Sequence, residues 1–356
     1  MAYTNIDDPS AYFQTALYTG NGSTQSITND GNSDMQPDWV WIKSRSNASW
    51  HNLFDSSRGA TKLVFSNDTN AEVTRSTSLT SFNTDGFTLG ADTVGADVNG
   101  LNRTYVAWQW KANGGTTSSN TNGGITTTVQ ANTDAGFSIV SYTGDGATSQ
   151  TVGHGLGAVP KMIISKDRYS TSNVPTWRVY HEAIGATKYL TLNATDAAAT
   201  FADWGNTTPT SSVYTIGGSG GYRPTNTNNT EYIAYVFAEK QGYSKFGSYV
   251  GNGNANGPFV YTGFRPAFIM IKRSDSTSSW QIKDSARNPN NLADKTVFAN
   301  LANTEYSTFY FYDLLSNGFK ARGTDSELNT SGGTYIYMAF AENPFVTSTG
   351  VPTTAR

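Results

Sequence analysis

The sequence of 356 residues contains no cysteine, which excludes disulfide bonds, thiolate metal sites and a cysteine nucleophile. Charged residues make up 14% of the chain, well below the ~25% of an average soluble protein. The net charge is -3, and the lysines and arginines form no block or stripe. A nucleic-acid surface needs such a stripe to neutralise phosphates, so we expect no nucleic-acid partner.

Long apolar runs are missing as well. No stretch approaches the ~20 residues that span a bilayer, and we expect no membrane insertion. Residues 1–9 have neither the basic start nor the apolar centre of a secretory signal. A protein with these properties that acts outside a cell is expected to leave by lysis or within a particle.

Glycine, serine, threonine and asparagine take the place of charged residues, and aromatic residues reach 13%. This composition is typical of β-sheets and turns rather than of helices. Three passages of the chain also repeat one another. Each has an opening turn with Gly-Asn-Gly or Gly-Asp-Gly, a proline-led apolar run that ends in lysine, and a closing strand. The opening turns lie at 18–22, 142–146 and 249–253, the lysines are Lys43, Lys166 and Lys272, and the closing strands begin at Tyr105, Tyr232 and Tyr335.

The closing strands carry large apolar side chains at every second position, so these side chains share one face. The opposite face is smaller and partly apolar, as expected for a strand that is covered on both sides. Together with frequent turn signals, this pattern predicts an all-β chain of three tandem antiparallel β-sandwiches with a jelly-roll-like course. The large residues are Val106, Trp108 and Trp110, then Ile233, Tyr235 and Phe237, then Ile336, Met338 and Phe340.

The repeats also divide the chain. We expect an N-terminal arm at 1–12, module 1 at 13–111, a flexible linker rich in Gly, Ser, Thr and Asn at 112–135, module 2 at 136–239, module 3 at 240–342 and a C-terminal tail at 343–356. Such a row of like modules favours assembly or multivalent binding, because an active site needs unlike groups that converge once.

No motif demands a metal or catalysis. The three histidines, His51, His154 and His181, occupy different places in the repeat and lack zinc-site spacing, so we interpret them as surface residues. A glycosidase needs two carboxylates, and Glu239 and Glu342 at the ends of closing strands keep that alternative open. We expect no catalytic residue, no metal and no cofactor.

Two further repeated features are interpreted as structural. A tryptophan follows each lysine, at Trp50, Trp177 and Trp280, and its fixed place favours the core over an exposed sugar platform. The acids Asp55, Glu182 and Asp284 come shortly after. We expect them to pair with Lys43, Lys166 and Lys272 at strand ends, where exposed pairs contribute ~0–1 kcal/mol.

Module 2 alone carries an inserted loop, 217–224, ahead of its closing strand. A loop without a packing role is available for contacts, so we expect Tyr222 and Arg223 to be ligand-binding residues.

The repeated phrases, together with Asp-Ser-Ser-Arg-Gly at 55–59 and Asp-Gly-Phe at 85–87, resemble an uncharacterised β-module of tail-fibre-like and other virion proteins of marine and cyanobacterial tailed phages. The likeness runs from about residue 13 to 345. Module 2 departs from it, with Glu-Ala-Ile-Gly at 182–185 in place of the Asp-Ser-x-Arg phrase, so its edge is expected to make a different contact.

This resemblance implies a non-enzymatic virion protein, assembled in the host cytoplasm and released by lysis. Its implied role is in a tail fibre or similar appendage that attaches to the host surface. The implied partners are other virion proteins, a host-surface glycan or receptor, and further copies in a homo-oligomer. The alternatives are a capsid or neck decoration or assembly protein, and a glycan-degrading appendage enzyme.

Overall fold

The computed structural model describes residues 3–93, 95–169, 177–308 and 310–353. Within them the chain forms β-strands, two short 3-10 turns, η1 (Pro9–Ala11) and η2 (Ala202–Trp204), and no α-helix. The prediction of an all-β chain with antiparallel sheets is therefore confirmed. The first two residues of the expected arm and the last three of the expected tail lie outside the described residues.

Each module contributes one large antiparallel sheet, in which the closing strand lies between the first strand and the proline-led strand. The order in module 1 is β1 (Phe13–Thr19), β9 (Thr104–Trp110), β3 (Trp39–Ser44), β4 (Asn52–Asp55), β5 (Lys62–Phe65) and β6 (Val73–Thr74). The order in module 2 is β10 (Ser118–Asn120), β11 (Thr127–Asn132), β12 (Phe137–Thr143), β19 (Glu231–Ala238), β14 (Pro160–Asp167) and β15 (Trp177–His181). The order in module 3 is β20 (Ser244–Val250), β27 (Thr334–Pro344), β22 (Phe264–Arg273), β23 (Gln281–Asp284) and β24 (Val297–Phe298). The order β1-β9-β3-β4 thus recurs as β12-β19-β14-β15 and as β20-β27-β22-β23.

Smaller antiparallel sheets form a second, outer layer in each module. They are β2 (Gln25–Ile27), β8 (Phe87–Leu89) and β7 (Leu79–Phe82) in module 1; β13 (Ser149–Gly153) with β18 (Val213–Gly217), and β16 (Lys188–Tyr189) with β17 (Ala199–Thr200), in module 2; and β21 (Phe259–Tyr261), β26 (Gly318–Ala321) and β25 (Tyr312–Leu315) in module 3. Ala107, Ala234 and Ala339 on the small face of the closing strands belong to three separate cores, one inside each module.

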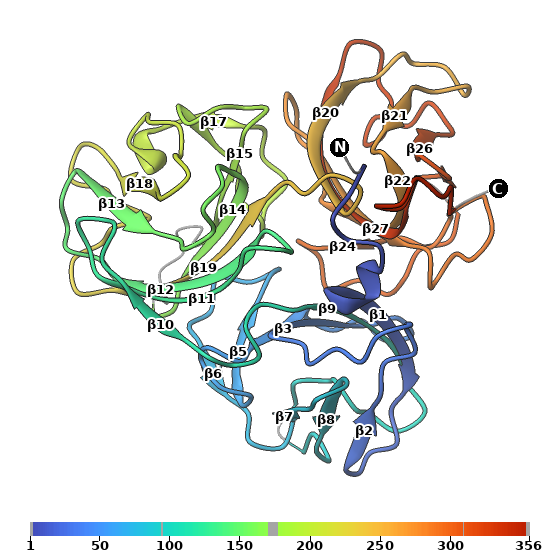
Figure 1. The fold of residues 1–356 in the computed structure, drawn as a ribbon, viewed down its shortest axis with the longest axis horizontal. Coiled ribbons are helices and arrows are strands. Elements are labelled where there is room, and N and C mark those ends of the chain that lie inside the picture. The colour runs from blue at the N-terminus through green and yellow to red at the C-terminus, as the bar shows by residue number, and fades with distance from the viewer. Residues whose placement is uncertain (1–2, 94, 170–176, 309, 354–356) are drawn as a thin grey trace.

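The large face of the closing strands points the other way, into one core that all three modules share. The nine large residues of these strands all belong to this single buried cluster. Figure 1 shows why: the three lobes surround a common centre, with the large sheets inside and the small sheets outside. Both faces of each closing strand are therefore buried, as the sequence pattern indicated.

Aromatic rings join the modules within this central core. The ring of Trp39 in module 1 stacks on that of Tyr235 in module 2, with centroids 4.2 Å apart. Phe13 of module 1 stacks on Phe340 of module 3 at 5.4 Å. The same Phe340 meets Phe237 of module 2 edge to face at 5.9 Å. The expected row of sandwiches is thus wrong in its arrangement, because the modules form a closed ring around a common core.

The segment 112–135 is not a flexible linker. It carries β10 and β11, which extend the sheet of module 2. Its start is fastened to module 1 by the buried Asp38, whose carboxylate accepts backbone N–H bonds from Ala112, Gly114 and Gly115 at 2.7–2.9 Å. Composition does not reveal that this segment is ordered, because the N–H groups of a glycine-rich turn can donate to a buried carboxylate as well as to water.

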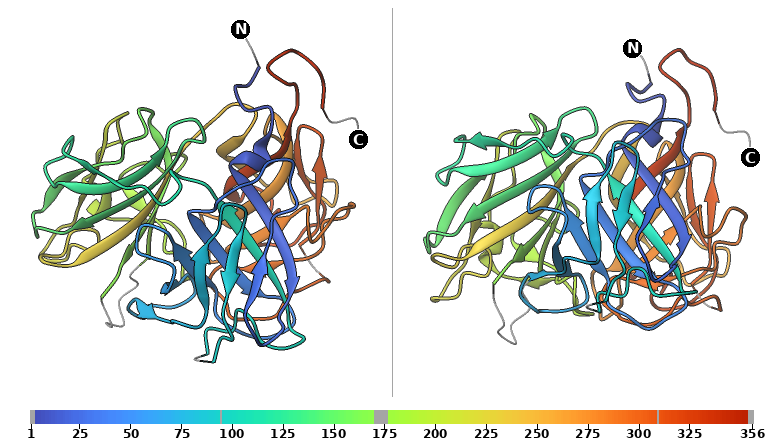
Figure 2. Two further views of the ribbon diagram at one scale, coloured as in Figure 1. Left: turned by 60° about the horizontal axis from the view of Figure 1, so that its bottom comes forward. Right: turned by 90° about the horizontal axis from the view of Figure 1, so that it is seen from below.

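The arm at the N-terminus packs against module 3. Ile6 is buried, the Thr4 hydroxyl donates to the carbonyl of Gln241, and the Tyr3 hydroxyl donates to that of Gly263. The tail meets the arm, since Ser348 donates from its backbone N–H and hydroxyl to the Asp7 carboxylate at 2.6 and 2.5 Å. Figure 2 shows both chain ends at the same end of the body.

Candidate functional site

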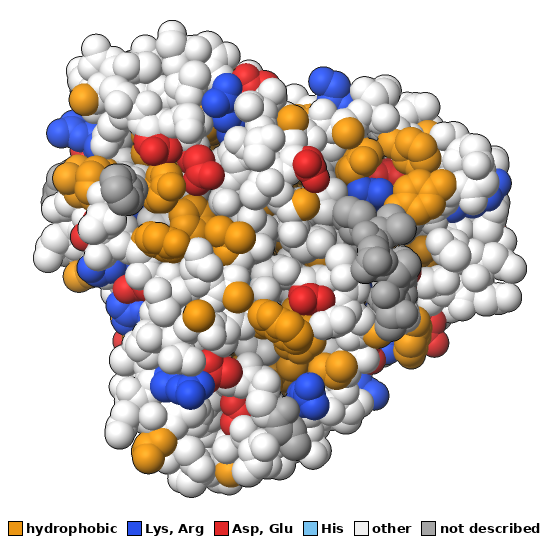
Figure 3. Space-filling model, turned by 180° about the vertical axis from the view of Figure 1, so that it is seen from behind, with side chains coloured by type: hydrophobic (Ala, Val, Ile, Leu, Met, Phe, Trp, Pro, Cys, Tyr) orange, Lys and Arg blue, Asp and Glu red, His pale blue; other side chains and the backbone are white. Residues whose placement is uncertain are grey.

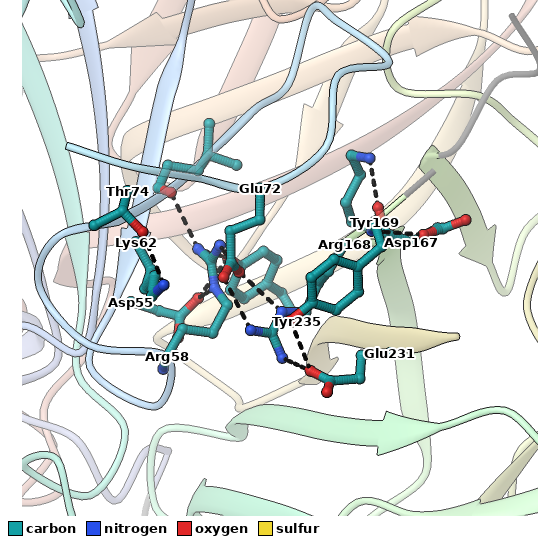
Figure 4. A network of polar contacts seen from close by, with 12 residues as sticks. Asp55, Arg58, Lys62, Glu72, Thr74, Asp167, Arg168, Tyr169, Glu231 and Tyr235 are labelled. Carbon is teal, nitrogen blue, oxygen red and sulfur yellow. Dashed lines mark hydrogen bonds and ion pairs between the residues drawn. The ribbon is translucent and has the colours of Figure 1, made fainter. Parts of the chain in front are cut away.

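Polar side chains cross the junctions between modules, and Figure 4 shows the group between modules 1 and 2. Nε of Arg58 lies 2.5 Å from the carboxylate of Asp55, and Nη1 lies 3.0 Å from that of Glu72. Arg168 of module 2 approaches the same glutamate at 2.8 Å. The Tyr235 hydroxyl donates to Asp55 at 2.9 Å. The side chains of Asp55 and Arg58 are at most 1% exposed, so this charged group is part of the interior.

The balance of charges keeps the Glu72 carboxylate ionised. Burial would raise the pKa of Glu72, but the hydrogen bond from Arg168 and the charges of Arg58 and Arg168 outweigh it and lower that pKa. Removing one member of a buried pair costs ~3–5 kcal/mol, because the remaining charge stays unpaired. The group therefore holds the two modules in one relative position.

The same arrangement recurs between modules 1 and 3. The strand registers place Asp284 opposite Phe268 as they place Asp55 opposite Trp39, so the two acids are equivalent. Nε of Arg287 lies 2.6 Å from Asp284, and Nη1 lies 3.2 Å from Glu305. The remaining partners come from module 1: Arg45 binds Glu305 at 2.9 Å, and Trp108 donates from Nε1 to Asp284 at 3.0 Å.

The junction between modules 2 and 3 lacks these charges. The register places His181 where the other junctions have an aspartate. Its Nδ1 accepts the N–H of Ala183, which leaves the proton on Nε2 to donate to the carbonyl of Tyr337 at 3.1 Å. Burial lowers the pKa of His181 to about 4. Ile184 and Ala198 take the places of Arg58 and Glu72 and pack against the central core.

The expected pairing of the repeated lysines with acids is wrong. Lys43, Lys166 and Lys272 are fully buried and donate to backbone carbonyls instead. Lys272 reaches the carbonyl of Thr195 in module 2 at 3.1 Å. Burial lowers the pKa of all three lysines to about 8. The acid of module 2, Glu182, pairs with Lys161.

The prediction for the histidines is wrong too, since His51, His154 and His181 are all buried. The tryptophan prediction holds for Trp177 and Trp280, whose Nε1 groups donate to carbonyls of the preceding module, those of Phe65 and Thr191. It fails for Trp50, which is 40% exposed. Strand register makes His51 the structural equivalent of those tryptophans, one residue further on. Its ring lies against the backbone of Phe298 in module 3, just as the two tryptophan rings lie against a neighbouring module.

Each opening turn is fixed by a buried asparagine that sequence reasoning missed. Asn99, Asn226 and Asn329 accept the backbone N–H of the turn residues Asn21, Asp145 and Asn252 at 2.8–3.1 Å. Glycines 22, 146 and 253 in these turns have φ of 66°, 75° and 66°, which disfavours other residues. A sequence signal exists, because each asparagine stands six residues before Tyr105, Tyr232 or Tyr335.

The predicted ligand-binding residues lie in an open loop beside the opening turn of module 2. Gly218 of this loop donates its N–H to the carbonyl of Thr148 at 3.1 Å. Tyr222 is 40% exposed and accepts a hydrogen bond from Arg178 at 3.1 Å. Arg223 holds the loop through its carbonyl, which accepts from Asn226 and Thr227. The structure therefore brings Tyr222, but not Arg223, to a side-chain cluster.

The described residues hold no arrangement typical of hydrolysis. Glu239 binds Lys245 at 2.7 Å and Glu342 pairs with Arg265, so each of the two carboxylates has its own basic partner. Residues 217–221 have the Gly-x-Ser-x-Gly spacing of a nucleophile elbow, but β18 leads there into a loop rather than into a helix. No group of three or more metal-ligating side chains occurs in the part of the chain that the structure describes.

A cavity of about 400 Å³ lies where the arm crosses the connection between modules 2 and 3. Its walls include Tyr3, Tyr12, Asp134 and Lys240. The cavity lies at the end of the body that carries the arm and the tail, which we call the terminal end.

Comparison with known proteins gives a family but no function. Among the described residues no helix has the length and apolarity to cross a membrane. No curated protein and no solved structure matches the chain significantly. One family model matches residues 8–344 as a single unit, which agrees with a body whose three modules share one core. The chain therefore belongs to the family described as a domain of unknown function, DUF7483.

Proposed function

We propose that the protein is a non-enzymatic structural component of a tailed-phage particle, assembled in the host cytoplasm and released by lysis. Within the particle it would form part of a tail fibre or similar appendage that meets the host surface. The observation that carries this proposal is that the body has two different ends. The arm and tail lie together at one end, and the opening turns of the three modules lie at the other end, which we call the turn end (Figure 2).

The chemistry of the turn end suits this role. Figure 3 views the body from that end: most of the visible surface is backbone or side chains that are neither charged nor apolar, with apolar side chains gathered in several small groups. The buried asparagines hold its loops in fixed shapes, so contacts there lose little conformational entropy. Three modules in one rigid body also present three opening turns at once. Once one of them has bound, the effective concentration of the others at the same surface is raised.

We assign one class of partner to each end of the body. Other virion proteins would bind the terminal end, and a host-surface glycan or receptor would bind the turn end. The homo-oligomer that the resemblance implies stays a prediction. A trimer of single modules would bury the apolar faces of their large sheets, but in this chain those faces are already buried against one another.

Adsorption tests the proposal. Labelled protein is incubated with a panel of marine bacterial and cyanobacterial strains, and we expect saturable adsorption to a subset of them. In parallel, antibody labelling of particles that carry the chain should mark the tail. Absence of adsorption together with labelling of the capsid or neck would refute attachment and favour a decoration role.

A further inference from the structure

Module 2 differs from its two neighbours at one buried strand position. Asn52 in β4 and Gln281 in β23 are neutral amides, and the equivalent residue in β15 is Arg178. All three side chains are buried, and Arg178 is only 4% exposed. The fold itself therefore accepts a neutral residue here, since two modules have one. A buried charge at the third calls for a separate explanation.

The arginine is held by a partner that module 2 also supplies. Its Nε lies 3.1 Å from the carboxylate of Asp203 in η2, which is fully buried. Its Nη1 donates to the hydroxyl of Thr191 at 3.3 Å. The positive charge is thus neutralised from the inner side, and the guanidinium plane is fixed.

Two aromatic rings flank this guanidinium, and a third ring lies against those two. The ring of Tyr189 in β16 lies 4.1 Å from its central carbon, and that of Tyr222 in the inserted loop lies 6.0 Å away. Phe201, which follows β17, approaches the ring of Tyr222 at 5.7 Å and that of Tyr189 at 6.5 Å. Nη2 of Arg178 also donates to the Tyr222 hydroxyl. The arginine therefore acts as the support on which the rings are arranged.

The outer side of this group is open. Tyr222 is 40% exposed, and Tyr189 and Phe201 are half-buried. Gly218 of the loop that carries Tyr222 donates to the carbonyl of Thr148, two residues beyond the opening turn of module 2, so the rings lie close to the turn end. Aromatic side chains that are already fixed in place lose little entropy when a ligand covers them.

We propose that Tyr189, Phe201 and Tyr222, which we call the aromatic platform, bind a saccharide. The C–H face of a sugar ring packs on aromatic faces, and the Tyr222 hydroxyl can exchange hydrogen bonds with sugar hydroxyls. A cationic ligand is disfavoured because Arg178 already occupies the space between the rings. An anionic ligand gains little from Arg178, whose charge Asp203 balances. This inference rests on the proposed attachment function and names the class of host-surface ligand.

Binding of isolated saccharides tests the platform directly. The full chain is screened on an array of bacterial surface oligosaccharides, and affinities for those that bind are measured by calorimetry. We expect Tyr222→Ala to weaken binding about tenfold, which corresponds to the loss of one aromatic stacking contact. Tyr222→Phe keeps the ring and should retain most of the affinity. The matched control is Tyr261→Ala, which removes a tyrosine of module 3 that is 53% exposed, and it should bind like the unaltered chain.

Two results would overturn the inference: no saccharide binds the unaltered chain, or Tyr222→Ala binds as tightly as Tyr261→Ala while both unfold at the same temperature as the unaltered chain. Cell adsorption separates this inference from the proposed function. Equal adsorption of the unaltered chain and Tyr222→Ala refutes the platform and supports attachment. Saccharide binding on the array without adsorption to any strain supports the platform and refutes attachment.

Discussion

Replacement of Arg58 by isoleucine tests how the charges between modules 1 and 2 are balanced. Isoleucine is the residue that module 2 has at the equivalent place, Ile184. The change leaves Asp55 and Glu72 buried without their common partner, and loss of one member of a buried ion pair costs ~3–5 kcal/mol. Glu72 keeps Arg168, 2.8 Å away, so the lower end of that range applies and we expect a loss of about 3 kcal/mol.

This loss can be measured by urea unfolding followed by tryptophan fluorescence and by circular dichroism. For a chain of 356 residues, an unfolding entropy of ~2.1 cal/mol/K per residue makes 3 kcal/mol equivalent to a shift of about 4 °C in Tm. Both probes should report one transition, because all three modules share the central core. Separate transitions for separate modules would contradict that core.

A fourfold variant provides the control. Asp55→His, Arg58→Ile, Glu72→Ala and Arg168→Ser together copy the junction between modules 2 and 3, in which no buried charge is left unpaired. We expect this variant to regain most of the stability that the single variant loses. The reasoning is refuted if Arg58→Ile costs less than ~1 kcal/mol, the value of an exposed pair, or if the fourfold variant is no more stable than the single one.

Three further outcomes are expected. His181 stays neutral in the fold down to a pKa of about 4, whereas in the unfolded chain it takes a proton near 6.5, so its contribution to stability is complete above pH 6.5 and about 3 kcal/mol of it is lost towards pH 4; His181→Gln should reduce the slope of stability against pH in this range in urea titrations, and an unchanged slope would contradict the assignment. Module 1 expressed alone should aggregate or bind hydrophobic dyes, because it exposes the tryptophans of β3 and β9; a monomer with cooperative unfolding would argue against the shared core. Asn329→Ala should cost ~1–3 kcal/mol by leaving the turn N–H of Asn252 unpaired, whereas the exposed Asn254→Ala should cost almost nothing, and equal effects in chemical denaturation would exclude the proposed role of the asparagine.

Period-two alternation predicted the sheets well, because it depends on local geometry. It placed Trp108, Tyr235 and Met338 on one face and indicated that both faces are covered. It could not tell what covers them, since an apolar face pairs equally well with a second layer or with another module. For this reason the pattern predicts a row of separate sandwiches, whereas the structure is a ring of three modules around one core.

At single positions, residue type alone predicts burial wrongly. Trp50 has the right type but the wrong register, and a shift of one residue along a strand moves a side chain to the opposite face. His51 takes the core position, where its ring accepts the indole N–H of Trp41 at 2.8 Å and lies against the backbone of Phe298 in module 3. The same limit applies to Arg178: its difference from Asn52 and Gln281 became visible only when the registers aligned the three strands.

The contact between Asp7 and Ser348 has a consequence for engineering. The ring of modules is closed by packing, and Asp7 and Ser348 bring the arm and the tail together, so a peptide could join the two while the chain is cut between β9 and β10. Such a circular permutant would present the modules in the order 2, 3, 1 yet reach the same native state. The order of the modules along the chain is then independent of their order in space. The new chain ends lie beside Tyr12, at the same end of the body as Asp7 and Ser348, so a reporter fused to them leaves the turn end uncovered.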